Sequence, residues 1–221
     1  MTDPTTAAPG TTAAPGTPGT PDAPGTPAAP GTPDERGHLD ALRSRLAGSA
    51  AEAGVLDVAW TAVDSPVGRL LLAATEVGLV RVAFEGEGHD SVLDRLAATV
   101  SPRVLRAPAR LDVVARELDE YFDGRRRSFD LPLDRRLSRS FQLAVLEHLP
   151  EIPNGATASY AAVAAAAGSP RAVRAVGTAC ATNPLPLVVP CHRVVRSDGT
   201  AGSYRGGPRA KALLIDLEAT S

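Results

Sequence analysis

Cysteines and long apolar runs are scarce in this chain of 221 residues, and each scarcity excludes a class of protein. Two cysteines, Cys180 and Cys191, cannot build a disulfide framework and are typical of a protein kept in a reducing compartment. No basic segment followed by an apolar core marks a secretory signal, and no apolar run approaches the roughly 20 residues that cross a bilayer. We therefore expect a cytoplasmic protein with no membrane partner.

Neither sign of charge dominates the chain, which has 23 basic and 25 acidic residues, but the charges are unevenly placed. Residues 1–133 hold 13 basic and 19 acidic side chains, whereas residues 134–221 hold 10 basic and 6 acidic ones. Lysine is nearly absent, since Lys211 is the only lysine among the 23 basic residues. If a polyanion binds, the C-terminal part is the better candidate, because it alone has a positive net charge.

Apart from Met1, residues 1–36 have no large apolar side chain and repeat Pro, Gly, Thr and Ala. Such a segment cannot bury enough surface to offset the entropy lost on ordering, so we predict a disordered tail. Residues 37–54 predict a short linker helix between this tail and the first domain.

Residues 55–134 have the patterns of a small α+β domain. Three apolar runs separated by the turn-like segments SPVG and EVG predict an antiparallel three-stranded sheet, with strands at about 57–63, 69–75 and 78–84. Apolar residues at helical spacing predict two helices, 89–100 and 111–122. The segment FDLPL (129–133) predicts an extended piece, and its proline is typical of a sheet edge.

Residues 135–221 predict a second, helical domain. Its first helix is expected over 138–149, with Ser138 or Ser140 as the N-cap. A last helix is expected over 208–219, where leucines recur at helical spacing.

Between these helices, residues 159–184 show two helical patterns separated by Gly168-Ser169-Pro170. We expect the glycine to end the first helix, the serine to cap the second and the proline to occupy its first turn. Two short helices joined by such a turn form a helix-turn-helix. Arg171 and Arg174 are three apart and share a face of the second helix, in which Cys180 is expected to be packed.

The segment LVVPCHRVVRSDG (187–199) carries the chemistry of this domain. Its apolar run reads as a buried strand that leads through Pro190 to Cys191 and His192. A cysteine acts as a nucleophile only as a thiolate, which needs a nearby base or positive field. Neighbours in an extended chain point to opposite sides, so a water molecule or a bent backbone would have to connect thiol and imidazole.

These residues alone leave several interpretations open. Cys191 could be a small buried apolar residue, as lone cysteines usually are. The protein could then be a helix-turn-helix regulator with an incidental cysteine, or a cysteine hydrolase that uses the Cys–His pair.

The longer context resembles one family, the O6-alkylguanine-DNA alkyltransferases, also called methylated-DNA–protein-cysteine methyltransferases. The resemblance covers roughly residues 56–219, is strongest from 141 on, and is most specific in NPLPLVVPCHRVV (183–195). It extends to the segments RELDEYFDGRRRSFDLPLD, FQLAVLEHLPEIPNGATASYAAVA, RAVRAVG and GSYRGGPRAKALLIDLE. The fold it implies is α+β, with a ribonuclease H-like N-terminal domain and a C-terminal winged helix-turn-helix domain.

The resemblance implies a DNA repair reaction without a cofactor. Cys191 would take the alkyl group from O6-alkylguanine, and possible activity on O4-alkylthymine stays open. The thioether is permanent, so that each molecule acts once. His192, acting through a water molecule and backed by Glu218, would accept the thiol proton. Tyr160 would protonate the leaving guanine, and Asn183 would hydrogen-bond around the active-site turn.

The same resemblance assigns residues to DNA. Arg174 would fill the space that the extrahelical base leaves in the duplex, and the other implied contacts of the second helix are Ala172, Ala175, Gly177 and Arg171. Tyr204 would wall the base pocket, whose other implied residues are Val194, Ser203 and Arg205. The implied partner is double-stranded DNA containing O6-alkylguanine, bound by a monomer.

This chain departs from the family pattern at several positions. Thr178 and Thr182 stand where glycines are frequent, Leu213 stands where a large aromatic is frequent, and LSRS precedes Phe141 in place of a Gly-Thr-Pro type start. Residues 1–133 have no cysteine and two histidines, so we predict no structural zinc. A binding-only relative that recruits other repair factors is a further alternative, and the presence of Cys191 argues against it.

Overall fold

The structure, a computed structural model, describes Met1 and residues 33–220. The tail predicted for 1–36 therefore lies almost wholly outside the described residues, which include only Met1 and 33–36 of it. Residues 33–36 are helical and belong to helix α1, which covers Pro33–Glu52. The helix begins at a proline, a residue that suits the first helical position. The boundary predicted between tail and helix is wrong by four residues.

The remaining elements follow in two groups. The first group comprises β1 (Val58–Val63), β2 (Leu70–Ala74), β3 (Leu79–Phe84), η1 (Glu85–Glu87), α2 (His89–Thr99), β4 (Val104–Arg106), η2 (Pro108–Leu111) and α3 (Asp112–Phe122). The second group comprises α4 (Ser140–His148), η3 (Leu149–Glu151), β5 (Ala158–Ser159), α5 (Tyr160–Ala166), α6 (Val173–Ala181), η4 (Cys191–Arg193), β6 (Val194–Val195) and α7 (Gly207–Ala219).

The first group forms a four-stranded sheet in the order β3-β2-β1-β4. The predicted antiparallel meander is present as β1, β2 and β3, and β4 adds to it by pairing parallel with β1. This fourth strand has only three residues between two prolines, which is too short to show a period in the sequence. The α+β fold class is confirmed.

The extended segment at 129–133 runs along the outer edge of β3, as its proline suggested. Leu79 N–H donates to the Pro132 carbonyl at 2.8 Å, and Leu133 forms a parallel bridge with Leu79. The approach is so close that a Cβ at Gly78 would lie 2.2 Å from the Pro132 oxygen. Only a glycine therefore fits at Gly78, whose φ of 152° is also unfavourable for other residues.

The second group contains the predicted helix-turn-helix, α5 and α6, followed by a small wing. Gly168 follows the last turn of α5 with a φ of 72°, as expected of a glycine that ends a helix. The wing begins where β6 pairs parallel with β5 and forms an antiparallel bridge between Val195 and Ala201. The winged helix-turn-helix is confirmed.

The predicted serine caps are wrong. The N-cap of α4 is Arg139, which makes no side-chain cap bond, and Ser140 lies inside the helix with a φ of 48°. Ser169 does not cap α6 either, because Ala172 occupies that position and its N–H donates to the Ser169 carbonyl in the preceding turn. The serine that does cap a helix is Ser159, whose hydroxyl accepts from Ala162 N–H at 3.1 Å.

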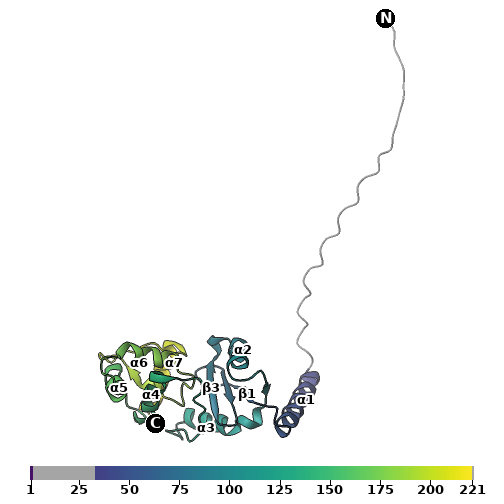
Figure 1. The fold of residues 1–221 in the computed structure, drawn as a ribbon, viewed down its shortest axis with the longest axis horizontal. Coiled ribbons are helices and arrows are strands. Elements are labelled where there is room, and N and C mark those ends of the chain that lie inside the picture. The colour runs from purple at the N-terminus through teal and green to yellow at the C-terminus, as the bar shows by residue number, and fades with distance from the viewer. Residues whose placement is uncertain (2–32, 221) are drawn as a thin grey trace.

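One apolar core joins the two groups of elements. Side chains of β2, β3 and α3 pack in the same buried cluster as side chains of α4, α6 and the segment 185–194. Figure 1 shows the helices of the second group gathered at one end, the sheet in the middle and α1 at the opposite end. The site described next lies in this shared core, so both groups position it.

Candidate active site

Cys191 lies at the start of a tight helical turn and not at the end of a strand. The apolar run before it, predicted as a strand, folds into turns in which Val189 N–H donates to the Leu185 carbonyl at 2.8 Å. Leu187 has a φ of 74°, a left-handed conformation that costs roughly 1 kcal/mol or more for a residue with a Cβ. The bent backbone places Cys191 and His192 in the single turn η4, so the alternation of an extended chain does not separate them.

Asn183 holds this turn together from the end of α6. Its Oδ1 accepts from Leu185 N–H at 2.9 Å, which closes a local turn. Its Nδ2 donates to the Val189 carbonyl at 2.9 Å and to Cys191 Sγ at 3.2 Å. The amide therefore fixes the backbone of the turn and offers the sulfur a hydrogen bond that favours the thiolate.

The thiol of Cys191 is 1% exposed. Burial raises its pKa to about 11, against the opposing effects of the Asn183 hydrogen bond and the charge of Lys211. The resting side chain is therefore a neutral thiol, which must lose its proton during any reaction as a nucleophile.

Glu218 on α7 accepts hydrogen bonds from several buried donors, one of which is the neighbour of Cys191 in the sequence. His192 Nε2 lies 2.8 Å from Glu218 Oε1, and Tyr121 Oη donates to the same oxygen at 2.7 Å. Arg193 forms a bidentate ion pair with the carboxylate, with Nε 2.8 Å from Oε2 and Nη2 2.9 Å from Oε1. Gly155 N–H adds a longer bond of 3.4 Å. A buried carboxylate with this many donors stays ionised and fixed in place.

The electrostatics of the His–Glu pair follow from these contacts. Burial alone would raise the pKa of Glu218, but hydrogen bonds from His192, Arg193 and Tyr121 outweigh it and hold that pKa well below its ordinary value. Burial lowers the pKa of His192, although the hydrogen bond to Glu218 opposes it. His192 is therefore a neutral base whose Nδ1 has no hydrogen-bond partner within the described residues.

Tyr160 lies at the start of α5 above the only lysine of the chain. Lys211 is fully buried, donates to the Val194 carbonyl at 2.6 Å, and places its ammonium 5.9 Å from the centroid of the Tyr160 ring. Burial raises the pKa of Tyr160, so the phenol keeps its proton. The phenol also fits closely against Gly202, where a Cβ would lie 2.0 Å from the hydroxyl oxygen.

A cavity of about 470 Å³ opens between α5, α6 and the wing. Four of the sequence-predicted residues line it, from three segments that the fold brings together: Tyr160, Arg174, Gly177 and Ser203. Five others lie nearby without lining it. Arg171, Ala172 and Ala175 belong to α6 and the turn before it, Val194 is buried behind Lys211, and Tyr204 packs its ring edge-on against His192 and Phe84.

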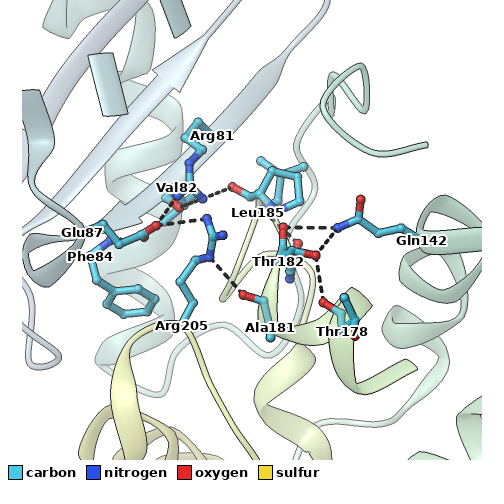
Figure 2. A network of polar contacts seen from close by, with 12 residues as sticks. Arg81, Val82, Phe84, Glu87, Gln142, Thr178, Ala181, Thr182, Leu185 and Arg205 are labelled. Carbon is cyan, nitrogen blue, oxygen red and sulfur yellow. Dashed lines mark hydrogen bonds and ion pairs between the residues drawn. The ribbon is translucent and has the colours of Figure 1, made fainter. Parts of the chain in front are cut away.

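Arg205, predicted to line the base pocket, lies elsewhere. Its Nε donates to the Ala181 carbonyl at the end of α6, and its Nη1 lies 3.0 Å from Glu87 Oε2. Figure 2 shows its guanidinium between Ala181 and Glu87, whose carboxylate also pairs with the buried Arg81. Arg205 therefore ties the loop after the wing to η1 and to the end of α6, and it is not among the residues that line the cavity.

Three residues of the site were missed by sequence reasoning: Tyr121, Arg193 and Lys211. Arg193 and Lys211 carried signals, because one follows His192 directly and the other is the only lysine among 23 basic residues. Tyr121 carried none, since it lies 97 positions from Glu218 and reaches it only through the packing of α3.

Within the described residues no helix is long and apolar enough to cross a membrane. The same residues contain no group of three or more His, Cys, Asp or Glu side chains that could hold a metal ion.

Fold and site together define a winged helix-turn-helix protein with a buried thiol beside a His–Glu pair. Two family models match: "6-O-methylguanine DNA methyltransferase, DNA binding domain" over residues 140–220 and "6-O-methylguanine DNA methyltransferase, ribonuclease-like domain" over 58–135. The chain belongs to this family, that of the methylated-DNA–protein-cysteine methyltransferases, which are DNA repair proteins. Residues 140–220 form its DNA-binding domain.

Relatives of known identity agree with this assignment. The constitutive methylated-DNA–protein-cysteine methyltransferase of Bacillus subtilis is 37% identical over 73% of this chain and 96% of its own length. The bifunctional transcriptional activator/DNA repair enzyme Ada of Escherichia coli is 40% identical, but the match spans 74% of this chain and only 46% of Ada. The solved structure of Mycobacterium tuberculosis OGT in complex with DNA is similar with a TM-score of 0.63, at 33% identity over 73% of this chain and 93% of that one.

Proposed function

We propose that Cys191 removes the alkyl group from O6-alkylguanine in double-stranded DNA and keeps it permanently. The sulfur attacks the alkyl carbon, a carbon–sulfur bond forms, and the bond between that carbon and guanine O6 breaks with its electron pair left on the purine. The product is a thioether and a normal guanine. We propose further that the thioether is not cleaved again, so that each molecule acts once, and that the protein acts as a monomer.

The thiol proton goes to His192 in this proposal. Burial gives Cys191 a high pKa, so deprotonation has to be coupled to attack by a base held nearby. His192 is neutral, has an available Nδ1, and is oriented through Nε2 by Glu218. One water molecule between Sγ and Nδ1 would complete the transfer. Glu218 stabilises the imidazolium that forms, and Tyr121 and Arg193 keep Glu218 in position.

The purine gains its proton from Tyr160. The phenol holds its proton at rest and lines the cavity next to α6. The ammonium of Lys211 beneath the ring stabilises the phenolate that forms when the proton is donated, because a cation attracts the electron-rich face of the ring.

The target base must leave the duplex, since an atom inside the base stack cannot reach a thiol that is 1% exposed. Arg174 is exposed on α6 beside the cavity and would fill the space in the stack. The small residues Ala172, Ala175 and Gly177 allow the backbone of α6 to approach the minor groove. The free thiol that the reaction needs makes the reducing cytoplasm the proposed compartment.

The observation that carries this proposal is the pair of contacts around one buried turn: Asn183 to the sulfur of Cys191, and His192 to Glu218. The test is the mass of the peptide containing Cys191 after incubation with an equimolar duplex bearing O6-methylguanine. We expect that peptide, and no other, to gain one methylene. Cys191→Ala should bind the duplex as tightly as the wild type and leave the lesion intact. An unmodified Cys191 in folded protein would refute the proposal, and repeated turnover would favour the hydrolase alternative.

A further inference from the structure

The proposed mechanism leaves one cation at the cavity unused. Arg196 follows β6 and lines the cavity beside Tyr160, with Arg174 of α6 also in the lining. It is exposed, and it belongs to the wing, not to the helix that enters the groove.

The wing holds Arg196 in one orientation. Its backbone N–H donates to the Thr200 carbonyl at 2.9 Å, and its Nη1 donates to Thr200 Oγ1 at 3.3 Å and to the Ala201 carbonyl at 3.2 Å. Thr200 is fixed in turn, because Asp198 Oδ1 accepts from its N–H at 2.9 Å and from its hydroxyl at 2.6 Å. A guanidinium anchored through one nitrogen keeps its other N–H groups available in a fixed fork.

Within the described residues, Arg196 lacks the direct acid partner that two other arginines of this domain, Arg193 and Arg205, have. Arg193 is paired with Glu218 and Arg205 with Glu87, whereas Arg196 forms no ion pair within the described part of the chain. Asp198 is the acid that feels its charge, and the pKa of Asp198 is lowered first by its bonds to Thr200 and only then by Arg196.

The charged side chains in the cavity lining are both arginines, Arg174 and Arg196. Arg174 lies in its lining and Lys211 lies behind the Tyr160 ring. A cavity with two arginines, a phenol and a serine matches an anionic, oxygen-rich group, and a guanidinium fork binds phosphate oxygens in pairs.

We propose that Arg196 binds the backbone phosphate of the nucleotide whose base enters the site. This inference rests on the proposed function, because the phosphate reaches the wing only if the nucleotide leaves the duplex toward Tyr160. Arg174 then replaces the base in the stack, while Arg196 holds the extruded nucleotide by its phosphate. The pair makes the site selective for a lesion within a DNA strand over the free modified base.

The test compares Arg196→Ala with the wild type on two substrates, a duplex bearing O6-methylguanine and the free base O6-benzylguanine. We expect transfer from the duplex to slow about tenfold, the effect of one charge-assisted hydrogen bond, and transfer from the free base to change less than about twofold. The slope of log affinity for duplex against log salt should fall by about 0.9, the value for one phosphate contact. Arg196→Lys should keep the salt slope and lose part of the rate.

The matched control is Arg209→Ala, which removes an exposed arginine of α7 outside the cavity and should change neither rate nor slope. Equal losses on both substrates, or an unchanged salt slope for Arg196→Ala, would overturn the proposal. If the wild type itself is not alkylated, the proposed function fails, and the salt slope still decides whether Arg196 contacts a phosphate.

Discussion

Gly202 offers the sharpest test of the Tyr160 assignment. A Cβ built on Gly202 lies 2.0 Å from the Tyr160 hydroxyl oxygen and 2.7 Å from two ring carbons, whereas ordinary contact begins at 3.4 Å. In Gly202→Ala the hydroxyl must therefore shift by more than 1 Å, and the tip of a half-buried side chain can do so. A misplacement of about 1 Å in a reacting group can cost about 100-fold in rate.

We expect Gly202→Ala to lower single-turnover transfer from an O6-methylguanine duplex about 100-fold. Stability should fall by no more than about 1–3 kcal/mol, the ordinary cost of an overpacked methyl group. The assay is rapid quenching of equimolar protein and duplex, followed by the mass of the Cys191 peptide. Gly86→Ala is the matched control, since a Cβ at Gly86 meets nothing within 4 Å.

Tyr160→Phe is the second variant of a double-mutant cycle with Gly202→Ala. Removing a general acid costs about 100-fold to 10,000-fold, and the double variant should be no slower than Tyr160→Phe alone. If Gly202→Ala transfers at the wild-type rate, or if the two losses multiply, then Gly202 does not act through the hydroxyl of Tyr160 and the reasoning is wrong.

Three further predictions concern ionisable groups in or near the core. Glu218 has a low pKa, so it adds stability that is fully present above about pH 4.3, its unfolded value, and is lost as pH falls below that value. Glu218→Gln should therefore cost about 3 kcal/mol at pH 7 and flatten the fall of melting temperature with pH below about pH 4.3. A fall as steep as that of the wild type would contradict this. Because the pKa of Cys191 is raised to about 11, its alkylation by iodoacetamide should still be rising at pH 10, and a plateau near pH 8 would disprove the assignment of a neutral thiol. Glu87→Gln should lower the free energy of unfolding in urea more than Arg205→Ala does, since it also leaves the buried Arg81 without its ion pair. The coupling energy between the two substitutions should be about 1 kcal/mol. Equal effects of the two single substitutions would show that Arg81 does not depend on Glu87.

Local patterns predicted the parts of the fold that depend on local chemistry. The glycine at 168 ends α5 because its φ of 72° suits glycine, and this is visible in the sequence. The serine caps failed because a serine near a helix start caps it only if the backbone turns toward it, and the chain enters α4 through Arg139. The strand β4 was missed because three residues carry no period, and its pairing with β1 depends on tertiary packing.

In the candidate site, too, sequence reasoning succeeded for residues within one local motif and failed for contacts between distant segments. Cys191, His192 and Asn183 lie in one motif, and the structure places Asn183 on the sulfur at 3.2 Å. Tyr121 was missed, and the contact of Arg205 with Glu87 was not predicted, because each contact joins segments about 100 positions apart: 97 for Tyr121 with Glu218 and 118 for Arg205 with Glu87. Such contacts are set by how α3 and the sheet pack on α7 and the wing, which no local pattern records.

Because Lys211 is buried, the reactivity of its amino group reports how often the folded protein opens. The ε-amino group of the only lysine in the sequence is fully enclosed, so amine-reactive acylating reagents find no lysine on the folded surface. Acylation of that one side chain can occur only when the core beneath Tyr160 opens. The rate of acylation therefore measures how often this part of the molecule opens. The same measurement on protein carrying an alkyl group at Cys191 would show whether the occupied core opens more often than the empty one.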